Sequence, residues 1–309
     1  MSPYPIVDVN TSRSLLILLV LTSLASPGWG NDTDSIVEPR RVKQGDVLAL
    51  TFPFRHADRM AVAEEFVGRF RDRETSVFPV AGGVGVLLGV DMEDAAGTGD
   101  FVLEWRKPDV TQVVARVAIS VLPGDFGVQK LSLPQKQVDL DTETVERVEA
   151  EQQAMLAAMR PVTPRAWEGG FVLPSEGSVQ KTFGLRRVIN GQSRRPHSGE
   201  DISAPLGTPV LAINEGTVQL VADHFFSGKS IVVDHGLGLY SMYFHLSSVV
   251  IQAGERVAKA QVIGAVGASG RASGPHLHWG VRLNGARVNP LSLATAVASV
   301  ADILQSDLR

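Results

Sequence analysis

The sequence predicts a mostly β protein with two domains joined by a helical segment. Its 309 residues suit two domains. Short runs rich in β-branched residues recur between turn-prone stretches, with 30 glycines and few aromatic residues. One central stretch instead has its apolar residues at helical spacing. We place the parts at 1–30 (export signal), 31–122 (a β-sandwich-like accessory domain), 123–174 (helical connector and linker) and 175–309 (a second β domain).

The first thirty residues have the composition of an export signal. Arg13 precedes an apolar run from Leu15 to Ala25, which is followed by small residues up to Gly30. The run is shorter than the ~20 residues that span a bilayer. We therefore expect cleavage near Gly30 and a mature protein in the periplasm or cell envelope, without a membrane span.

Residues 36–122 contain six or seven predicted strands, including 47–52, 84–90 and 113–119, with a turn-prone stretch at 95–100. This number of strands in under a hundred residues indicates a small β-sandwich, of the immunoglobulin kind. No catalytic constellation occurs there. His56 has no evident partner and is expected on the surface. We interpret this domain as a spacer or binding module.

A helix is predicted from about Thr142, with Asp141 as its N-cap and Pro161 ending it. The helical spacing of three and four residues is seen in Val145, Val148, Gln152, Met155 and Met159. The stretch to Pro174 then has the character of a linker.

Strand patterns return from Gly177 to about Leu293, at 208–213, 216–221, 230–234 and 278–283. The connections leave no room for long helices, so the sheet is expected to be mostly antiparallel. Six of the seven histidines lie in this half. With no cysteine in the chain and a net charge of −4, thiolate chemistry is excluded and nucleic-acid binding is not indicated.

Two short motifs offer metal ligands. His197 and Asp201 flank Gly199, where a sharp turn could bring their side chains together. His276 and His278 are two apart, so on a strand both imidazoles point to the same face. A structural polar pair is the alternative for the second motif, and a solvated His–Asp pair for the first. Their joint occurrence favours a metal site.

His245 lies in an apolar and aromatic strand, where an imidazole needs a partner. His235 is expected at a strand end or turn and His224 in a loop, both without a direct chemical role. Five candidate groups thus remain. Three can hold zinc and two can transfer protons, and these are the functional groups that an amide hydrolase needs.

The order His-x-x-x-Asp, Tyr-x-His-Leu-Ser and Gly-Pro-His-Leu-His-Trp-Gly resembles the lysostaphin and LytM-type M23 metallopeptidases. The likeness covers roughly residues 177–290 and includes Phe183-Gly184-Leu185-Arg186-Arg187. It implies an antiparallel β-sheet groove with Zn²⁺ at its floor, held by His197, Asp201 and His278. His245 and His276 would be the catalytic histidines. Phe244 stands where many members have glycine, and is expected to narrow the groove locally.

The resemblance implies a zinc endopeptidase that cuts the stem-peptide cross-links of peptidoglycan. The alternatives are a non-catalytic relative that binds peptidoglycan or activates an amidase, and a zinc hydrolase with another substrate. Because all five residues are present, we favour the active enzyme. Both a polyglycine bridge and a direct link from D-alanine to a diamino acid suit the fold, and we favour the direct link. The accessory domain is expected to restrict access to the groove or to recruit an envelope regulator.

Overall fold

The computed structural model describes residues 39–53, 65–80, 83–135 and 138–306. The predicted export signal and His56 lie outside these ranges. Strands dominate, as predicted, and two helices occur in the described ranges. None of the described helices is long and apolar enough to cross a membrane.

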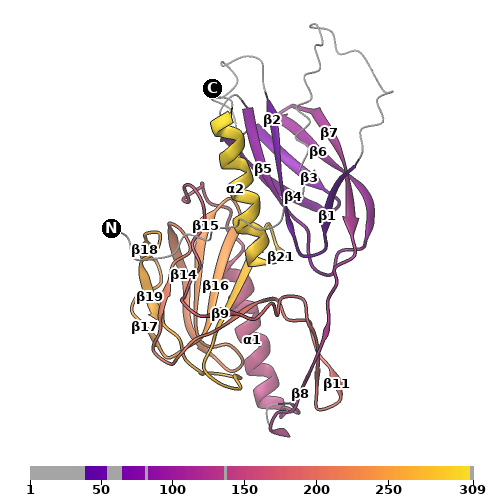
Figure 1. Ribbon diagram of the computed structural model, residues 1–309. Helices are drawn as coiled ribbons and strands as arrows, with labels where there is room; N and C mark the ends of the chain where they lie inside the picture. The colour runs from indigo at the N-terminus through magenta and orange to yellow at the C-terminus, as the bar shows by residue number, and fades with distance from the viewer. Residues whose placement is uncertain (1–38, 54–64, 81–82, 136–137, 307–309) are drawn as a thin grey trace, which may run out of the picture. The chain divides into compact units, whose positions relative to one another are not determined.

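Seven strands in the first half form one hydrogen-bonded path, β1-β7-β6-β3-β4-β5-β2 (Figure 1). Their bounds are β1 Arg40–Lys43, β2 Val47–Pro53, β3 Phe66–Phe70, β4 Arg73–Val80, β5 Gly83–Gly89, β6 Gly97–Lys107 and β7 Val110–Leu122. The first half of β4 pairs with β3 and its second half with β5, so β4 joins the two layers. Both layers contribute to a core that includes Phe70, Leu88 and Phe101. The predicted turn at 95–100 is too long, because β6 begins at Gly97.

The segment between the two β regions contains more structure than the sequence predicted. Strand β8 (Val128–Leu131) pairs in parallel with β10, which belongs to the second half. Helix α1 (Thr142–Ala158) begins where predicted, and the Asp141 side chain accepts a hydrogen bond from the Thr144 amide. The helix predicted from the three- and four-residue spacing is confirmed, and none of the residues of α1 is buried.

The second half is built on an eight-stranded sheet with β18, β14, β15, β16, β20, β12 and β9 in order and β21 paired to β20. The bounds are β9 Ser178–Val179, β10 Arg186–Ile189, β11 Gln192–Ser193, β12 Gly199–Ser203, β13 Pro209–Leu211, β14 Gly216–His224, β15 Gly228–Gly236, β16 Leu239–Leu246, β17 Ser248–Val249, β18 Arg256–Val257, β19 Val262–Ala265, β20 Leu277–Leu283 and β21 Ala286–Val288. Every pairing in this sheet is antiparallel, as predicted.

Helix α2 (Pro290–Ser306) follows β21 and was not predicted. It begins with Pro290 directly after Asn289, a pair typical of a helix start. It contacts β2 and β5 of the first half (Figure 1). It also contacts β20 of the second half.

The two faces of the main sheet differ. Tyr243, Trp279 and Val281 are fully buried in the core. The opposite face carries Met242 and Phe244, which pair with Gly280 and His278. Met155 and Met159 of α1 pack on this second face, against a small cluster of Val232, Tyr240 and Met242. The connecting helix therefore lies on the sheet face that carries His278.

Candidate metal centre

Two neighbouring strands bring the predicted ligands together. Strand β12 pairs with β20 so that Asp201 lies directly opposite His278. His197 lies two residues before β12 begins, and its amide and carbonyl bond to Leu185 and Gly184. The ligand motifs, 77 residues apart in sequence, are thus joined by a single strand pairing.

Three ligand atoms converge at this point. Nε2 of His197 lies 2.8 Å from Nδ1 of His278. Oδ1 of Asp201 lies 3.0 Å from the same Nδ1 and 3.1 Å from Nε2 of His197. Zinc bonds of 2.0–2.2 Å in a tetrahedral arrangement separate ligands by about 3.3 Å. The three atoms therefore fit one small divalent cation, to which each would contribute a lone pair.

Burial strengthens the case for a cation. The His197 residue is 1% exposed and His278 is 7% exposed. Three mutually facing acceptors repel one another unless protons or a cation lie between them, and a single proton bridges only one pair. Burial lowers the pKa of His278 to about 4, so a protonated imidazole is disfavoured there. A metal ion satisfies all three groups at once.

The carboxylate of Asp201 is held in its charged form. Burial acts to raise its pKa, but the two imidazoles that face it, those of His197 and His278, outweigh burial and lower it. Arg187 adds a longer contact, with Nη2 3.9 Å from Oδ2. An ionised carboxylate is what a metal ligand requires.

A second layer of contacts orients His197. Its Nδ1 lies 3.0 Å from the carbonyl oxygen of Thr182, so Nδ1 carries the proton and Nε2 keeps its lone pair. The Thr182 hydroxyl in turn accepts a bond from the Asp201 amide. Buried Glu200 accepts from the Thr182 amide at 2.8 Å. Sequence reasoning missed Thr182 and Glu200, whose roles depend on a loop contact across 18 residues.

His276 and His245 complete the cluster. Nε2 of His276 lies 3.9 Å from Oδ1 of Asp201, and the two imidazole rings are 4.8 Å apart. Nδ1 of His245 bonds to the Ser269 carbonyl at 2.9 Å, and Nδ1 of His276 to the Gly274 carbonyl at 2.9 Å. Each carbonyl fixes a proton on Nδ1, which leaves Nε2 of each ring as a proton acceptor.

The backbone at His245 is unusual. Its φ of 64° lies in the left-handed region, which non-glycine residues seldom adopt. The His245 amide donates to the Ser227 carbonyl at 2.8 Å, which fixes this conformation. Burial, followed by the nearby charge of His278, lowers the pKa of His245 to about 3. The imidazole is therefore neutral near pH 7.

Phe244 contacts the centre directly. Its ring stacks on the His278 imidazole, with centroids 5.3 Å apart and planes at 4°. From the sequence, we expect this residue to narrow the groove. The structure adds a second consequence, that the phenyl ring fixes the plane of a candidate ligand.

The other histidines of the described chain lie outside the cluster. His235 is fully buried, with Nδ1 2.7 Å from the Glu215 carbonyl and Nε2 2.7 Å from the Ser241 hydroxyl. It joins strands within the core and lies at the end of β15, as expected. His224 was expected in a loop, and this was wrong, because it is the last residue of β14.

The comparisons with known proteins agree with this geometry. Residues 195–290 match Peptidase family M23. The part of the chain that holds the candidate metal centre therefore matches the family that the sequence motifs indicated.

Among curated relatives, Peptidoglycan DD-endopeptidase ShyA of Vibrio cholerae is 33% identical over 130 residues, covering 42% of this chain and 30% of the relative. DD-carboxypeptidase/endopeptidase Mpg of Neisseria meningitidis is 39% identical over 137 residues, covering 41% of this chain and 32% of the relative. The matches thus span about a third of those relatives or less.

One solved structure, a putative peptidase M23 from Pseudomonas aeruginosa, matches with a TM-score of 0.63 and 28% identity. The match covers 82% of this chain and 95% of that chain. Because 82% far exceeds the share held by the peptidase domain, the likeness also includes part of the first half.

Proposed function

We propose that this chain is a zinc-dependent endopeptidase that hydrolyses the peptide cross-links of bacterial peptidoglycan. One observation carries the proposal: the ligand atoms of His197, Asp201 and His278 lie within 4.8 Å of one another. His245 and His276 lie beside them with one ring nitrogen free. The M23 domain and the names of the curated relatives support peptidoglycan as the substrate.

We assign the metal-binding and proton-transfer roles from the contacts of the five side chains. His197, Asp201 and His278 would hold the ion, for which two imidazoles and a carboxylate favour zinc. Bound zinc polarises a scissile carbonyl and lowers the pKa of its water. Nε2 of His245 and Nε2 of His276 would accept a proton and return it to the departing amine.

The proposal also states which peptide bond is cut and where the enzyme acts. Since both relatives are named for DD-peptidase activities, we infer the direct cross-link from D-alanine to a diamino acid. Export, indicated by residues 1–30, would bring the enzyme to its substrate. The accessory domain, residues 31–122, would restrict the groove or bind an envelope regulator.

The test is mass spectrometry of the fragments released from purified peptidoglycan by residues 31–309, with and without a chelator. Peptide-cleaved products that vanish with chelator and return with zinc are expected, and their masses identify the bond. His278→Ala should release none, while His224→Ala, a histidine outside the cluster, should match the unchanged protein.

If the folded, metal-loaded protein releases no products from several wall types, the endopeptidase proposal is wrong. Binding of the same wall material without cleavage would then indicate the non-catalytic, amidase-activating role.

A further inference from the structure

The turn 225–227, between β14 and β15, is bonded to His245. The Ser227 carbonyl accepts from the His245 amide at 2.8 Å, at the point where the backbone has its φ of 64°. Just beyond the turn, the Lys229 amide donates to the Ser269 hydroxyl at 2.9 Å. The carbonyl of the same Ser269 is the partner of the His245 ring, 2.9 Å from Nδ1. This turn therefore bears on both the backbone and the imidazole of His245.

Helix α1 holds the same turn from outside the sheet. Oε2 of Glu151 accepts from the Phe225 amide at 2.8 Å. Oε1 of Glu151 accepts from Nε of Arg147 at 2.7 Å, one helical turn earlier. The Arg147 guanidinium lies 5.9 Å from the centroid of the Phe225 ring, within the range of a cation–π contact. Two side chains of α1 thus contact a single residue of the turn.

The Glu151 carboxylate is a strong constraint on this turn. No residue of α1 is buried, and Met155 and Met159 pack on the sheet only towards the C-terminal end of the helix. The Glu151 side chain is 17% exposed, so its bond to the Phe225 amide is largely shielded from water. A hydrogen bond to an ionised carboxylate is about twice as strong as one between neutral groups.

We propose that Glu151 is a positioning residue for His245, the proposed proton-transfer group, and acts on it through the turn 225–227. This inference rests on the proposed endopeptidase function. A left-handed backbone at a residue other than glycine persists only where its surroundings fix it. Without the Glu151 contact the turn and His245 relax together, and a shift of about 1 Å in a catalytic group can lower the rate about 10²-fold. The connecting helix is then part of the active site and not only a spacer.

The test compares Glu151→Met with Glu151→Gln. Both side chains have similar length and helix propensity, but only glutamine keeps an oxygen that can accept from the Phe225 amide. With a synthetic cross-linked peptide, Glu151→Met should lower kcat about tenfold and leave KM within about twofold, because the proposed metal ligands are untouched. Glu151→Gln should keep most of the rate. Zinc affinity should be unchanged in both variants.

Glu149→Met is the matched control, because it makes the same change at an exposed position of α1. It should behave as the unchanged protein. Equal kcat in Glu149→Met and Glu151→Met overturns the inference, as does an equal loss in Glu151→Met and Glu151→Gln. If Glu151→Met fails to fold by circular dichroism, Arg147→Met, which removes the other contact to Phe225, carries the test with an expected loss of about threefold.

Hydrogen exchange of the His245 amide, followed by NMR, provides a readout that does not depend on turnover. Glu151→Met should speed this exchange at least about threefold, because the bond to Ser227 opens more often, whereas Glu149→Met should not. Faster exchange in Glu151→Met, when even the unchanged protein cleaves no peptide, would refute the endopeptidase function and leave the positioning contact standing. Unaltered exchange and unaltered cleavage in Glu151→Met would do the reverse.

Discussion

Gly199 lies against the imidazole of His278, and no other residue fits there. A Cβ at this position would lie 2.6 Å from Nε2 of His278 and 2.6 Å from the Trp279 carbonyl. We expect Gly199→Ala to displace the imidazole and weaken zinc binding roughly 10- to 100-fold, the usual effect of disturbing the contacts behind a ligand. Competition with a chromogenic chelator measures this affinity.

Gly170→Ala is the control for Gly199→Ala, because a Cβ at Gly170 meets nothing within 4 Å. Equal zinc affinity in the two variants would contradict the tight contact. Thermal unfolding of the metal-free proteins separates a local displacement from a general loss of stability.

Alanine substitutions should separate the two classes of histidine. His278→Ala removes a proposed ligand, so both bound zinc and peptide cleavage are expected to be lost while the fold persists. His245→Ala should keep the zinc, because His245 is outside the three proposed ligands and its ring centroid lies 6.2 Å from that of His278. Cleavage should fall about 10²- to 10⁴-fold.

Metal content by mass spectrometry, cleavage rate and circular dichroism check this pair of variants together. If His245→Ala loses the metal, the assignment of His245 to proton transfer is wrong.

At the scale of elements, periodicity predicted the longer strands and α1 well. The alternation in His276-Leu277-His278 placed two imidazoles on one face, and β20 begins at Leu277 with that pattern. Asp141 was a correct N-cap because capping depends on neighbouring residues alone. These features are local, so the sequence contains the information for them.

The structural features that the sequence did not predict share a physical cause. Strand β8 has four residues and is stabilised by pairing with β10, 58 positions later, which no local pattern reveals. The stack of Phe244 on His278 and the left-handed backbone of His245 likewise depend on which strands become neighbours. Which residues of the helical segment pack on the sheet, Met155 and the C-cap Met159 among them, also depends on that arrangement.

Helix α1 depends on its cap more than on packing. None of its residues is buried, so packing contributes little to its stability. The hydrogen bond from the Thr144 amide to the Asp141 side chain, 2.8 Å long, therefore contributes a larger share. Asp141→Ala should speed hydrogen exchange of the amides in the first turns of α1 by roughly three- to tenfold. Asp109→Ala, at the exposed β6–β7 turn, should leave these amides unchanged. Unchanged exchange in Asp141→Ala would show that tertiary contacts alone hold the helix.

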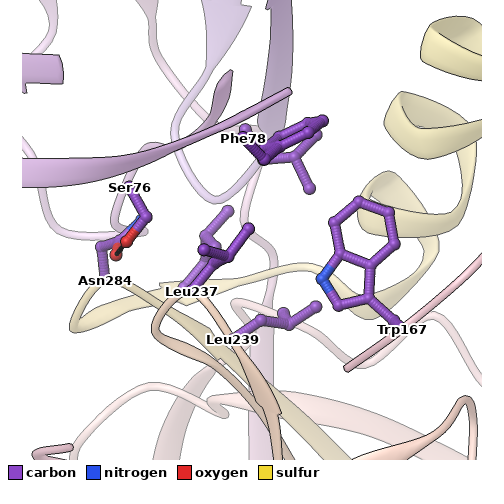
Figure 2. Close-up of a pocket in the computed structure, with 8 residues that line it drawn as sticks. Ser76, Phe78, Trp167, Leu237, Leu239 and Asn284 are labelled. Carbon is purple, nitrogen blue, oxygen red and sulfur yellow. Dashed lines mark hydrogen bonds between the residues drawn. The ribbon is translucent and has the colours of Figure 1, made fainter. Parts of the chain in front are cut away.

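At the scale of the whole described chain, the two β halves are joined by an ion pair and by apolar packing. Arg287 on β21 donates to both carboxylate oxygens of Asp91 and through its amide, at 2.5–3.0 Å. Nearby, Phe78, Trp167 and Leu239 surround a small cavity of about 10 Å³ (Figure 2). Phe78 and Trp167 meet edge to face, with ring centroids 5.5 Å apart.

Asp91 makes the stability of this junction depend on pH. Burial acts to raise its pKa, but the bonds and charge of Arg287 outweigh burial and lower it below the ordinary value of 3.8. A depressed pKa stabilises the folded state fully above about pH 4 and progressively less as pH falls through the folded pKa. Asp91→Ala should cost about 3 kcal/mol at pH 7 and flatten this acid dependence.

Urea unfolding of the unchanged protein and of Asp91→Ala at pH 7 and pH 3 checks the expectation, with Asp109→Ala as the control. A variant that loses as much stability between pH 7 and pH 3 as the unchanged protein would contradict it.

The junction also dictates an order of assembly. Asp91 and Arg287 are 196 residues apart in the chain. A ribosome adding about 5–20 residues per second reaches Arg287 roughly 10–40 s after Asp91. The accessory strands can pair with one another from the outset, whereas their outer partners, β21 and α2, are translated later. Until then the face that later meets α2 is uncovered, so any chain released early would present it to other proteins.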